Sequence, residues 1–518
     1  MTAMSLRLLA PMLILSLGCV VVMLSIAWRR SNLQTASVTG ASMILSLLSL
    51  IPALGRPEMR VPPLFLFDGY FVFACVLVLL SALAVLLLSV GYIGALRSGL
   101  TDEYYLLLLI ATLGAVIMLA SDHFVTFFLG LETLSVALLG LIAYPRHRLD
   151  ATEAAMKYLV LAGTSSAFLL FGIALIYAVS GTLSFTPDQA AMANGTVVAH
   201  ANLYRLAALA FILTGIGYKL SIVPFHMWAP DVYEGAPAPV AAYVAVVSKL
   251  SVFTVLMRYF ITRPGNADHT ALTAIAIFAV LSMIIGNLLA LGQNNLKRLL
   301  AYSSVAHLGY LLVAFLAPRS FGIEATSFYL AAYAVTTLGA FGVVTILSDP
   351  LDTQDVGNLE SYRGLFWRRP WLAGILTAML MSLAGIPPTM GFIAKAYVMV
   401  AGVGAGLTIP LVALIIGSVL GLYYYLRVIV IMVMPAADAS FAKPLYLPPG
   451  SRIALAALVI LLIGLGAYPA ALIPAIRASS PAIMTETAVP SGSRNYAARP
   501  AIQGPNPRGD RLVQAYTR

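Results

Sequence analysis

The sequence predicts an all-α polytopic membrane protein with about fourteen transmembrane helices. Of its 518 residues, 61% are hydrophobic and only 10% are charged, and the mean hydropathy is +0.94. Ordinary soluble domains are about 25% charged, so this composition excludes a soluble globular protein and excludes disorder over most of the chain. The apolar residues form continuous runs rather than short alternating segments, which favours helices over a transmembrane barrel.

Fourteen apolar runs are long enough to cross about 30 Å of hydrocarbon. The first is interpreted as a retained span rather than a signal peptide, because it lacks a small-residue cleavage site and is followed by Arg29 and Arg30. Only Ala120 and Ser121 separate the fourth run from the fifth. The predicted spans are 8–28, 36–54, 69–92, 104–120, 122–143, 155–180, 203–228, 237–261, 270–292, 296–316, 324–347, 370–404, 408–434 and 452–474.

The basic residues of the short loops predict the orientation. If the N-terminus is outside, twelve Lys and Arg residues lie in inside loops and four in outside loops, which favours both termini outside. The tail 478–518 is basic, rich in Pro, Ser, Gly, Ala and Arg, and without apolar periodicity, so it is predicted to be disordered and is left out of this count. The twelve are Arg29, Arg30, Arg97, Arg146, Arg148, Lys297, Arg298, Arg363, Arg368, Arg369, Lys443 and Arg452, and the four are Arg56, Arg60, Arg263 and Arg319.

Several classes of function are disfavoured by what the sequence carries. The formal charge of +10 does not indicate nucleic-acid binding, because no basic stripe is interleaved with exposed aromatic residues. Two cysteines, Cys19 and Cys75, exclude a disulfide scaffold and a cysteine-rich metal or iron–sulfur site. No glycine-rich phosphate loop occurs, which disfavours nucleotide-driven transport within this chain.

Most charged residues lie in loops or at the ends of predicted spans, but four lie near the middle of a span, where a charge is costly. Glu132, Lys219, Lys249 and Lys395 each interrupt an apolar run, and each central charge costs about 2.5–3.5 kcal/mol on insertion scales. Such residues usually line a polar interior and mark a route for ions or protons. The alternative is a set of structural ion pairs, but Glu132 can pair with only one lysine, which leaves two lysines without an acidic partner in any span.

The excess of lysine over glutamate suggests proton exchange. Burial disfavours the charged form of an amine, so a buried lysine can accept and release protons, which arginine cannot. A Glu–Lys pair beside an isolated lysine can then act as a switch, because moving the pair apart changes the proton affinity of the next site. Three further residues are secondary candidates for the relay: Lys157, which is alternatively a lysine reaching for the membrane surface, and His226 and His307, which are alternatively hydrogen-bonded packing residues.

Two predicted spans are broken by proline. Pro224 follows Lys219 in the seventh span, and Pro387 and Pro388 precede Lys395 in the twelfth. Freed backbone groups inside a membrane must face protein or water, so broken helices in both halves suggest a buried site between inverted repeats. The spacing of these residues is consistent with an internal repeat, since Glu132 precedes His307 by 175 residues and Lys219 precedes Lys395 by 176. The alternative is that these prolines merely kink packed helices.

The segment HMWAPDVYEGAPAPV after Pro224 is too polar for contact with lipid, since it carries Asp231, Glu234 and three further prolines. We expect it to form a structured turn between two functional helices. A catalytic role is disfavoured, because no nucleophile–base pair or metal-ligand spacing accompanies it.

Four segments of the chain form a distinctive set: GYKLSIVPFHMWAPDVYEGAPAPVAAYVAVVSKLSVF, NNLKRLLAYSSVAHLGYLL, YRGLFWRRP and SLAGIPPTMGFIAKAYV. Together they resemble the antiporter-like membrane subunits of bacterial NADH-quinone oxidoreductase (respiratory complex I), and the subunit N family in particular. The resemblance covers roughly residues 60–435. Lys395, where the M-type subunits have glutamate, and the fourteen-span length favour subunit N over the L, M and Mrp sodium/proton antiporter relatives.

The resemblance implies a division of the chain and a role for each span charge. It implies N-terminal helices in 1–103, two inverted five-helix repeats in 104–261 and 270–434, each with a discontinuous helix, and a last helix in 452–474. Glu132 and Lys219 match the input pair of one proton channel, Lys249 the central relay, Lys395 the output-side site and Lys157 the lysine of the sixth span.

From these observations we expect a proton-translocating subunit of NADH-quinone oxidoreductase, placed in a bacterial inner membrane and driven by redox chemistry in partner subunits. The resemblance implies no cofactor in this chain, with FMN, iron–sulfur clusters and quinone in the partners. The expected partners are other membrane subunits of the complex and lipids, not nucleic acid. The alternatives are an Mrp-type cation/proton antiporter subunit and a structural scaffold that conducts nothing.

Overall fold

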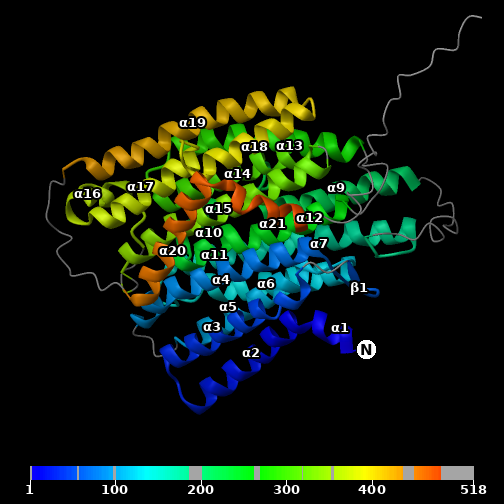
Figure 1. Ribbon diagram of the computed structural model, residues 1–518, viewed down its shortest axis with the longest axis horizontal. Coiled ribbons are helices and arrows are strands. Elements are labelled where there is room, and N and C mark those ends of the chain that lie inside the picture. Colours follow the sequence, from blue (N-terminus) through cyan, green and yellow to red (C-terminus); the bar gives the residue numbers. More distant parts are fainter. Residues whose placement is uncertain are drawn as a thin grey trace, which may run out of the picture.

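The computed structural model describes residues 3–54, 58–96, 101–185, 201–261, 269–317, 319–349, 351, 355–435 and 448–479. Within these ranges long helices lie side by side in one bundle, with a single short hairpin at one end (Figure 1). The fold class predicted from the sequence, an all-α polytopic membrane protein, is confirmed. The predicted disordered tail falls almost wholly outside the described residues, which end at Ser479.

The first part of the described chain runs to residue 185. Its elements are α1 (Ala3–Leu8), α2 (Ala10–Trp28), α3 (Asn32–Leu48), η1 (Ile51–Ala53), β1 (Met59–Val61), β2 (Phe65–Phe67), α4 (Gly69–Gly94), α5 (Glu103–Leu119), α6 (Phe124–Ile142) and α7 (Leu149–Ser180).

The chain continues through two broken regions to the last helix. The elements are α9 (Ala201–Leu220), α10 (Trp228–Gly235), α11 (Ala238–Tyr243), η2 (Val244–Ser248), α12 (Lys249–Ile261), α13 (His269–Leu291), α14 (Leu296–Phe315), α15 (Arg319–Leu347), η3 (Leu359–Tyr362), α16 (Leu365–Arg368), α17 (Pro370–Ala384), α18 (Met390–Gly404), α19 (Thr408–Val433), α20 (Pro449–Ala467), η4 (Pro469–Ala471) and α21 (Ile473–Ser479).

The fourteen predicted spans all have a helical counterpart in the described chain. Twelve helices are long and apolar enough to cross a membrane by themselves. The shorter apolar helix α5 and the pair α17 and α18 supply the other two spans. The predicted boundary between the fourth and fifth spans, at Ala120 and Ser121, is confirmed, because α5 ends at Leu119 and α6 begins at Phe124.

Each of the two discontinuous helices ends directly before a residue with a left-handed backbone. In the seventh span α9 ends at Leu220 and Ser221 has φ +58°, so the helix stops four residues before Pro224 rather than running to 228. In the twelfth span α17 ends at Ala384, its C-cap Gly385 has φ +84°, and α18 begins at Met390. Glycine adopts this conformation without a Cβ penalty.

A short antiparallel hairpin, β1 with β2, braces one end of the bundle, and the sequence analysis did not predict it. Phe65 also forms a bridge with Ser121 between α5 and α6. Arg258 of α12 reaches this end, where its Nη2 lies 2.8 Å from an Asp68 carboxylate oxygen and its Nη1 donates to the Leu66 carbonyl. Strands of three residues are too short for a visible period of two.

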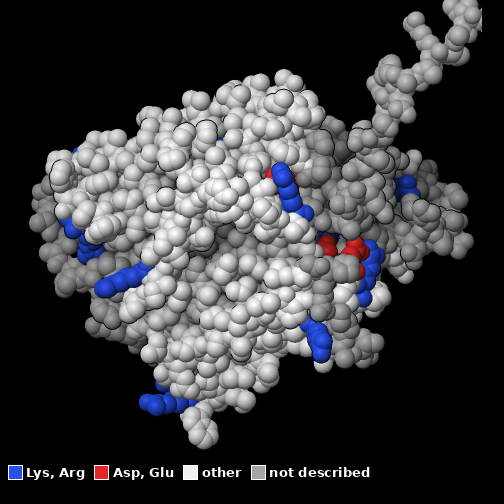
Figure 2. Space-filling view, viewed as in Figure 1, with Lys and Arg blue, Asp and Glu red and all other residues white. Residues whose placement is uncertain are grey.

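The outer surface of the bundle is largely uncharged. Figure 2 shows a broad face of mostly uncharged side chains, with Lys and Arg mainly toward its edges. Large apolar side chains are exposed on many helices, among them Leu24, Val136, Val160, Val419 and Ile460, each at least 60% exposed. Exposed apolar surface of this extent fits contact with lipid or neighbouring subunits.

Candidate proton relay site

Three lysines of the predicted relay are buried inside the bundle. Lys219, Lys249 and Lys395 are 4%, 2% and 6% exposed. Each Nζ donates to a neutral acceptor: Ser135 Oγ at 2.7 Å, Ser304 Oγ at 2.6 Å and the Ala384 carbonyl at 2.9 Å, respectively. Among the described residues none of the three lies within 4.0 Å of a carboxylate oxygen. Structural ion pairs therefore do not account for these lysines.

Glu132 and Lys219 are each hydrogen-bonded to a different serine rather than to one another. Ser135, the acceptor for Lys219, lies three residues after Glu132 on α6, so the side chains of Ser135 and Glu132 share one face of that helix. The half-buried Glu132 carboxylate accepts a hydrogen bond of 2.5 Å from Ser166 Oγ of α7. Lys219 of α9 thus binds the face of α6 that carries Glu132, with a hydroxyl bound to each charge.

The break after Lys219 is held by side chains of neighbouring elements. The Val223 amide donates to Ser282 Oγ of α13 at 3.0 Å, and Trp228 Nε1 donates to the Tyr218 carbonyl at 2.9 Å. The His226 ring is buried in this break, with its centroid 6.4 Å from the Tyr302 ring. Its Nδ1 has no hydrogen-bond partner within the described chain. Freed backbone groups inside the bundle thus find protein partners, as a broken membrane helix requires.

Lys249 begins α12 directly after a π-helical turn, Val244–Ser248. Such turns in α-helices often occur at functional sites. Every residue from Ala238 to Arg258 is buried. The Lys249 ammonium lies 5.4 Å from the centre of the Tyr233 ring, and its acceptor Ser304 also receives the Tyr333 hydroxyl at 2.6 Å.

One face of α14 continues from Lys249 toward Lys395. His307 lies one turn after Ser304; the Tyr329 hydroxyl lies 2.7 Å from its Nδ1, and the Tyr425 hydroxyl 3.3 Å from its Nε2. Tyr310, a further turn along, lies edge to face with His307, at a centroid distance of 5.4 Å. The Lys395 ammonium lies 5.2 Å from the centre of the Tyr310 ring. Polar and aromatic side chains of α14 therefore lie between the two lysines.

The second break fixes Lys395 at the start of α18. Gly385 caps the end of α17, and a Cβ at this position would lie 2.8 Å from Lys395 Cδ. The glycine thus leaves room for the lysine stem to fold back to the last carbonyl of α17, that of Ala384. Pro387 and Pro388 lie in the non-helical link, and the Gly391 amide donates to Ser382 Oγ across it at 3.0 Å.

Lys157 lies apart from the buried lysines. Its side chain is 43% exposed, and its Nζ lies 2.8 Å from carboxylate oxygens of both Glu153 and Asp231. Asp231 belongs to α10, a helix where the sequence predicted only a structured turn. Burial acts to raise the pKa of Asp231, but hydrogen bonds from Lys157 and Arg298 outweigh it and hold that pKa below its ordinary value.

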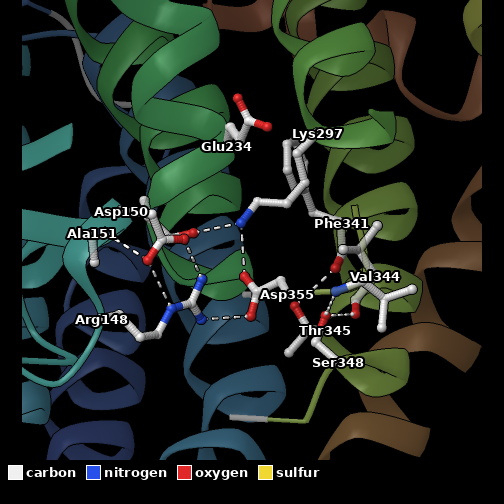
Figure 3. A network of polar contacts seen from close by, with 12 residues as sticks. Arg148, Asp150, Ala151, Glu234, Lys297, Phe341, Val344, Thr345, Ser348 and Asp355 are labelled. Atoms are coloured by element: carbon white, nitrogen blue, oxygen red, sulfur yellow. Dashed lines mark hydrogen bonds and ion pairs between the residues drawn. The ribbon is translucent and has the colours of Figure 1, made fainter. Parts of the chain in front are cut away.

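A buried ion cluster at the start of α14 was missed as a site by the sequence analysis (Figure 3). The Asp355 carboxylate accepts from Arg148 at 2.9 Å, from Lys297 at 2.7 Å and from the Tyr92 hydroxyl at 2.7 Å. The side chains of the three charged residues are at most 1% exposed. We counted Arg148 and Lys297 only as loop charges, although Lys297 lies inside the predicted span 296–316, which was the available signal.

The Asp355 anion is shared by two cations, Arg148 and Lys297. Burial acts to raise the pKa of Asp355, but the adjacent Lys297 and Arg148 cations outweigh it and hold that pKa below its ordinary value. Burial acts to lower the pKa of Arg148, but the Asp355 carboxylate, the Tyr92 phenol and the Asp150 carboxylate outweigh it and raise that pKa. Asp355 is therefore ionised at neutral pH, and Arg148 has a second carboxylate partner in Asp150, at 3.1 Å.

The sequence of this chain matches a known family. Residues 121–421 match the family described as NADH:quinone oxidoreductase/Mrp antiporter, TM. A curated relative, NADH-quinone oxidoreductase subunit N of Ectopseudomonas mendocina (strain ymp), is 46% identical over 437 residues, which are 84% of this chain and 87% of the relative.

Solved structures share the fold. A chain of respiratory complex I from Thermus thermophilus with bound aureothin is 32% identical, with a TM-score of 0.76 over 90% of this chain and 100% of the other. The archaeal membrane-bound sulfane sulfur reductase (23% identity, TM-score 0.79, covering 91% and 96%) and the Mrp complex from Dietzia sp. DQ12-45-1b (20%, 0.76, covering 92% and 97%) match in fold alone.

The bundle with two broken helices and a line of buried lysines defines an antiporter-like membrane protein. The chain belongs to the NADH:quinone oxidoreductase/Mrp antiporter family. Within that family it belongs with the NADH-quinone oxidoreductase subunit N proteins.

The buried cluster predicts a large loss of stability in Asp355→Asn. The substitution leaves Arg148 and Lys297 without their shared anion, and breaking a buried pair costs about 3–5 kcal/mol. We expect a lower midpoint in thermal unfolding of the purified protein. Glu360→Gln is the matched control, because Glu360 is 66% exposed in its pair with Arg363 and exposed pairs contribute about 0–1 kcal/mol.

The difference in stability between the native chain and Asp355→Asn is expected to depend on pH. The pKa of Asp355 is lower in the folded chain than in the unfolded chain, where it is about 3.9. Its stabilising contribution is therefore complete above about pH 4 and is lost as the pH falls through the folded value. The difference in midpoint between the native chain and Asp355→Asn should shrink on acidification, and a difference that grows would contradict this assignment.

Proposed function

We propose that this chain is a proton-translocating membrane subunit of NADH-quinone oxidoreductase. The observation that carries the proposal is the set of three buried lysines, each hydrogen-bonded to a neutral acceptor and none paired with a carboxylate in the described chain. Intramembrane ionisable residues of this kind mark proton routes in pumps and transporters. Family membership supports the same role.

The geometry suggests an order of sites along the relay. Glu132 and Lys219 form the input element, Lys249 the centre and Lys395 the output-side site. Movement of Glu132 relative to Lys219 would change how firmly the lysine holds its proton, because a nearby anion favours the ammonium form. A proton leaving Lys219 then passes to Lys249, and from there along α14.

His307 is the residue best placed to continue the path from Lys249 to Lys395. Its two ring nitrogens face the hydroxyls of Tyr329 and Tyr425, so the imidazole can take a proton on one side and release it on the other. We propose Ser304 and Tyr310 as its neighbours on either side. Water between these groups would complete the chain of hydrogen bonds.

Lys157 and His226 keep secondary roles in this proposal. Lys157 is tied to Asp231 of α10, the short helix between the break after Lys219 and the span of Lys249. It is therefore placed to influence that break rather than to carry protons inside the bundle. His226 lies in the break itself with an unpartnered, buried Nδ1, which makes it a candidate for water-mediated access to Lys219.

The energy for transport must come from partner subunits. Each charge moved against 100 mV requires about 2.3 kcal/mol. We propose that redox reactions at FMN, iron–sulfur clusters and quinone in partner subunits supply it, and that this chain takes part in the enzyme as a non-redox subunit. Neighbouring membrane subunits and lipids would cover the exposed apolar surface.

We propose a bacterial inner-membrane location with both termini on the periplasmic side. The support is the excess of Lys and Arg in the opposite loops. A reporter that is active only in the periplasm, fused after residue 518, should be active, whereas the same reporter placed between residues 363 and 369 should be inactive. The reverse result would overturn this orientation.

Single substitutions of the relay lysines should reduce proton pumping by the assembled complex. Lys249→Ala and Lys395→Ala each remove an ionisable site, and we expect NADH-driven proton translocation in membrane vesicles to fall at least tenfold for a positioned proton carrier. Arg363→Ala, which removes an exposed pair with Glu360, is the matched control and should leave translocation unchanged.

The same measurement separates the alternatives. Unchanged translocation in both lysine variants would leave the chain as a structural scaffold. Proton movement that requires sodium or potassium and continues without NADH would favour an Mrp-type cation/proton antiporter. Equal amounts of assembled complex in all variants, checked by immunoblotting, ensure that lost pumping does not reflect lost assembly.

A further inference from the structure

Lys297 binds the connection between α10 and α11, formed by Ala236 and Pro237, which we call the joint. Lys297 lies in the first turn of α14, and its Nζ donates to the Ala236 carbonyl at 2.6 Å as well as to Asp355. Ala236 connects α10 to α11 and has an extended backbone, with ψ of 151°. Its carbonyl therefore lies outside both helices and needs a partner from elsewhere.

Both segments that meet at this joint contact or carry Lys249. α10 supplies Tyr233, whose ring lies 5.4 Å from the Lys249 ammonium. α11 and the π-helical turn lead directly into Lys249 at the start of α12. The position of the joint therefore sets where the ammonium lies relative to the Tyr233 ring.

α14 holds this unit at a second point. Ser304, which accepts the hydrogen bond from Lys249 Nζ, follows Lys297 by seven residues on the same helix. Seven residues are about two turns, so the two side chains lie on one face, about 10 Å apart along the axis. Lys297 thus binds the backbone at the joint, and Ser304 binds the Lys249 ammonium.

Lys297 is itself held by groups from other parts of the bundle. Asp355, its carboxylate partner, also binds Arg148 at the start of α7 (Figure 3). The Tyr92 hydroxyl of α4 donates to the same carboxylate. Its neighbour Arg298 binds Asp231 and Glu234 of α10 at 2.8 and 2.7 Å. The start of α14 therefore ties α10 and the joint to α4, α7 and the segment that contains Asp355.

We propose that Lys297, backed by Asp355 and Arg148, is a positioning residue for the proton relay at Lys249. It holds the joint between α10 and α11 so that the Lys249 ammonium stays between Ser304 and the Tyr233 ring. This inference rests on the proposed relay function. It assigns Lys297 no proton-carrying step of its own.

The test compares Lys297→Met, Lys249→Ala and the double variant in assembled complex. Methionine keeps an unbranched apolar side chain without the ammonium group, and Arg148 still neutralises Asp355. Displacement of Lys249 by about an ångström should lower NADH-driven proton translocation on the order of tenfold or more. Because Lys297 acts through Lys249, the double variant should pump no less than Lys249→Ala alone.

Two further variants serve as a substitute for Lys297→Met and as a control. Lys297→Gln replaces Lys297→Met if the latter does not assemble, and it should show the same lack of additivity. Glu324→Gln breaks the pair of Glu324 with Arg477, in which Glu324 is 9% exposed and which does not touch the joint. It should leave translocation per complex unchanged.

The outcomes distinguish this inference from the proposed function. If Lys249→Ala lowers translocation but the Lys297 variants do not, the positioning role is wrong and the relay stands. If the effects of Lys297→Met and Lys249→Ala multiply in the double variant, Lys297 does not act through Lys249 and the inference is overturned. If Lys249→Ala itself has no effect, the relay is wrong and the positioning role falls with it.

Discussion

The burial of three lysines inside apolar spans is the constraint on which the rest of this structure depends. A central charge costs about 2.5–3.5 kcal/mol on insertion scales, and the described chain places no carboxylate within pairing distance of the three ammonium groups. Instead it provides one hydroxyl or carbonyl oxygen for each, and an aromatic ring within 6.0 Å of each Nζ. Under the proposed relay, neutral contacts of this kind would allow each lysine to exchange a proton.

The broken helices follow from the same constraint. At Lys395 the end of α17 exposes the Ala384 carbonyl, which an unbroken helix would have used internally. At Lys219 the helix stops one residue later, at Leu220, and the link that follows is held by Ser282 and Trp228. Each break therefore supplies polar backbone beside a lysine without placing a second charge in the bundle.

The ion cluster at Asp355 does the opposite with its charges. It holds Arg148, Lys297 and Asp355 in ion pairs, and all three side chains are nearly inaccessible. Removing one partner of a buried pair is costly, because it leaves an uncompensated ion. The described chain thus has a paired set of buried charges, which ties the elements together at the start of α14, and an unpaired set, the three lysines, which we propose for transport.

Much of this architecture could be predicted from the sequence. The fourteen spans follow from apolar length, and Lys219, Lys249 and Lys395 stand out because a charge in such a run is rare. The interruption near Pro387 and Pro388 was also expected and is present. These features are local, so they are visible in a single stretch of sequence.

The contacts between distant segments could not be predicted. Arg148 and Lys297 looked like ordinary loop charges, and nothing nearby in sequence indicated that Asp355 would join them. Ser135, Ser166 and Ser304, which bind the span charges, are common residues without a distinctive spacing. The separation of Glu132 from Lys219 by hydroxyl groups is likewise a result of how α6, α7 and α9 pack, and the resemblance to the family suggested only a pair.

The proposed proton relay requires a continuous polar path from Lys219 through Lys249 to Lys395. A structure of the assembled complex with ordered waters tests this directly. We predict waters that join Lys249, Ser304, His307 and Lys395 in steps of hydrogen-bond length, about 2.7–3.2 Å, with a branch from Lys249 to Lys219. A dry, apolar gap between Lys249 and Lys395 in every state of the working complex would contradict it.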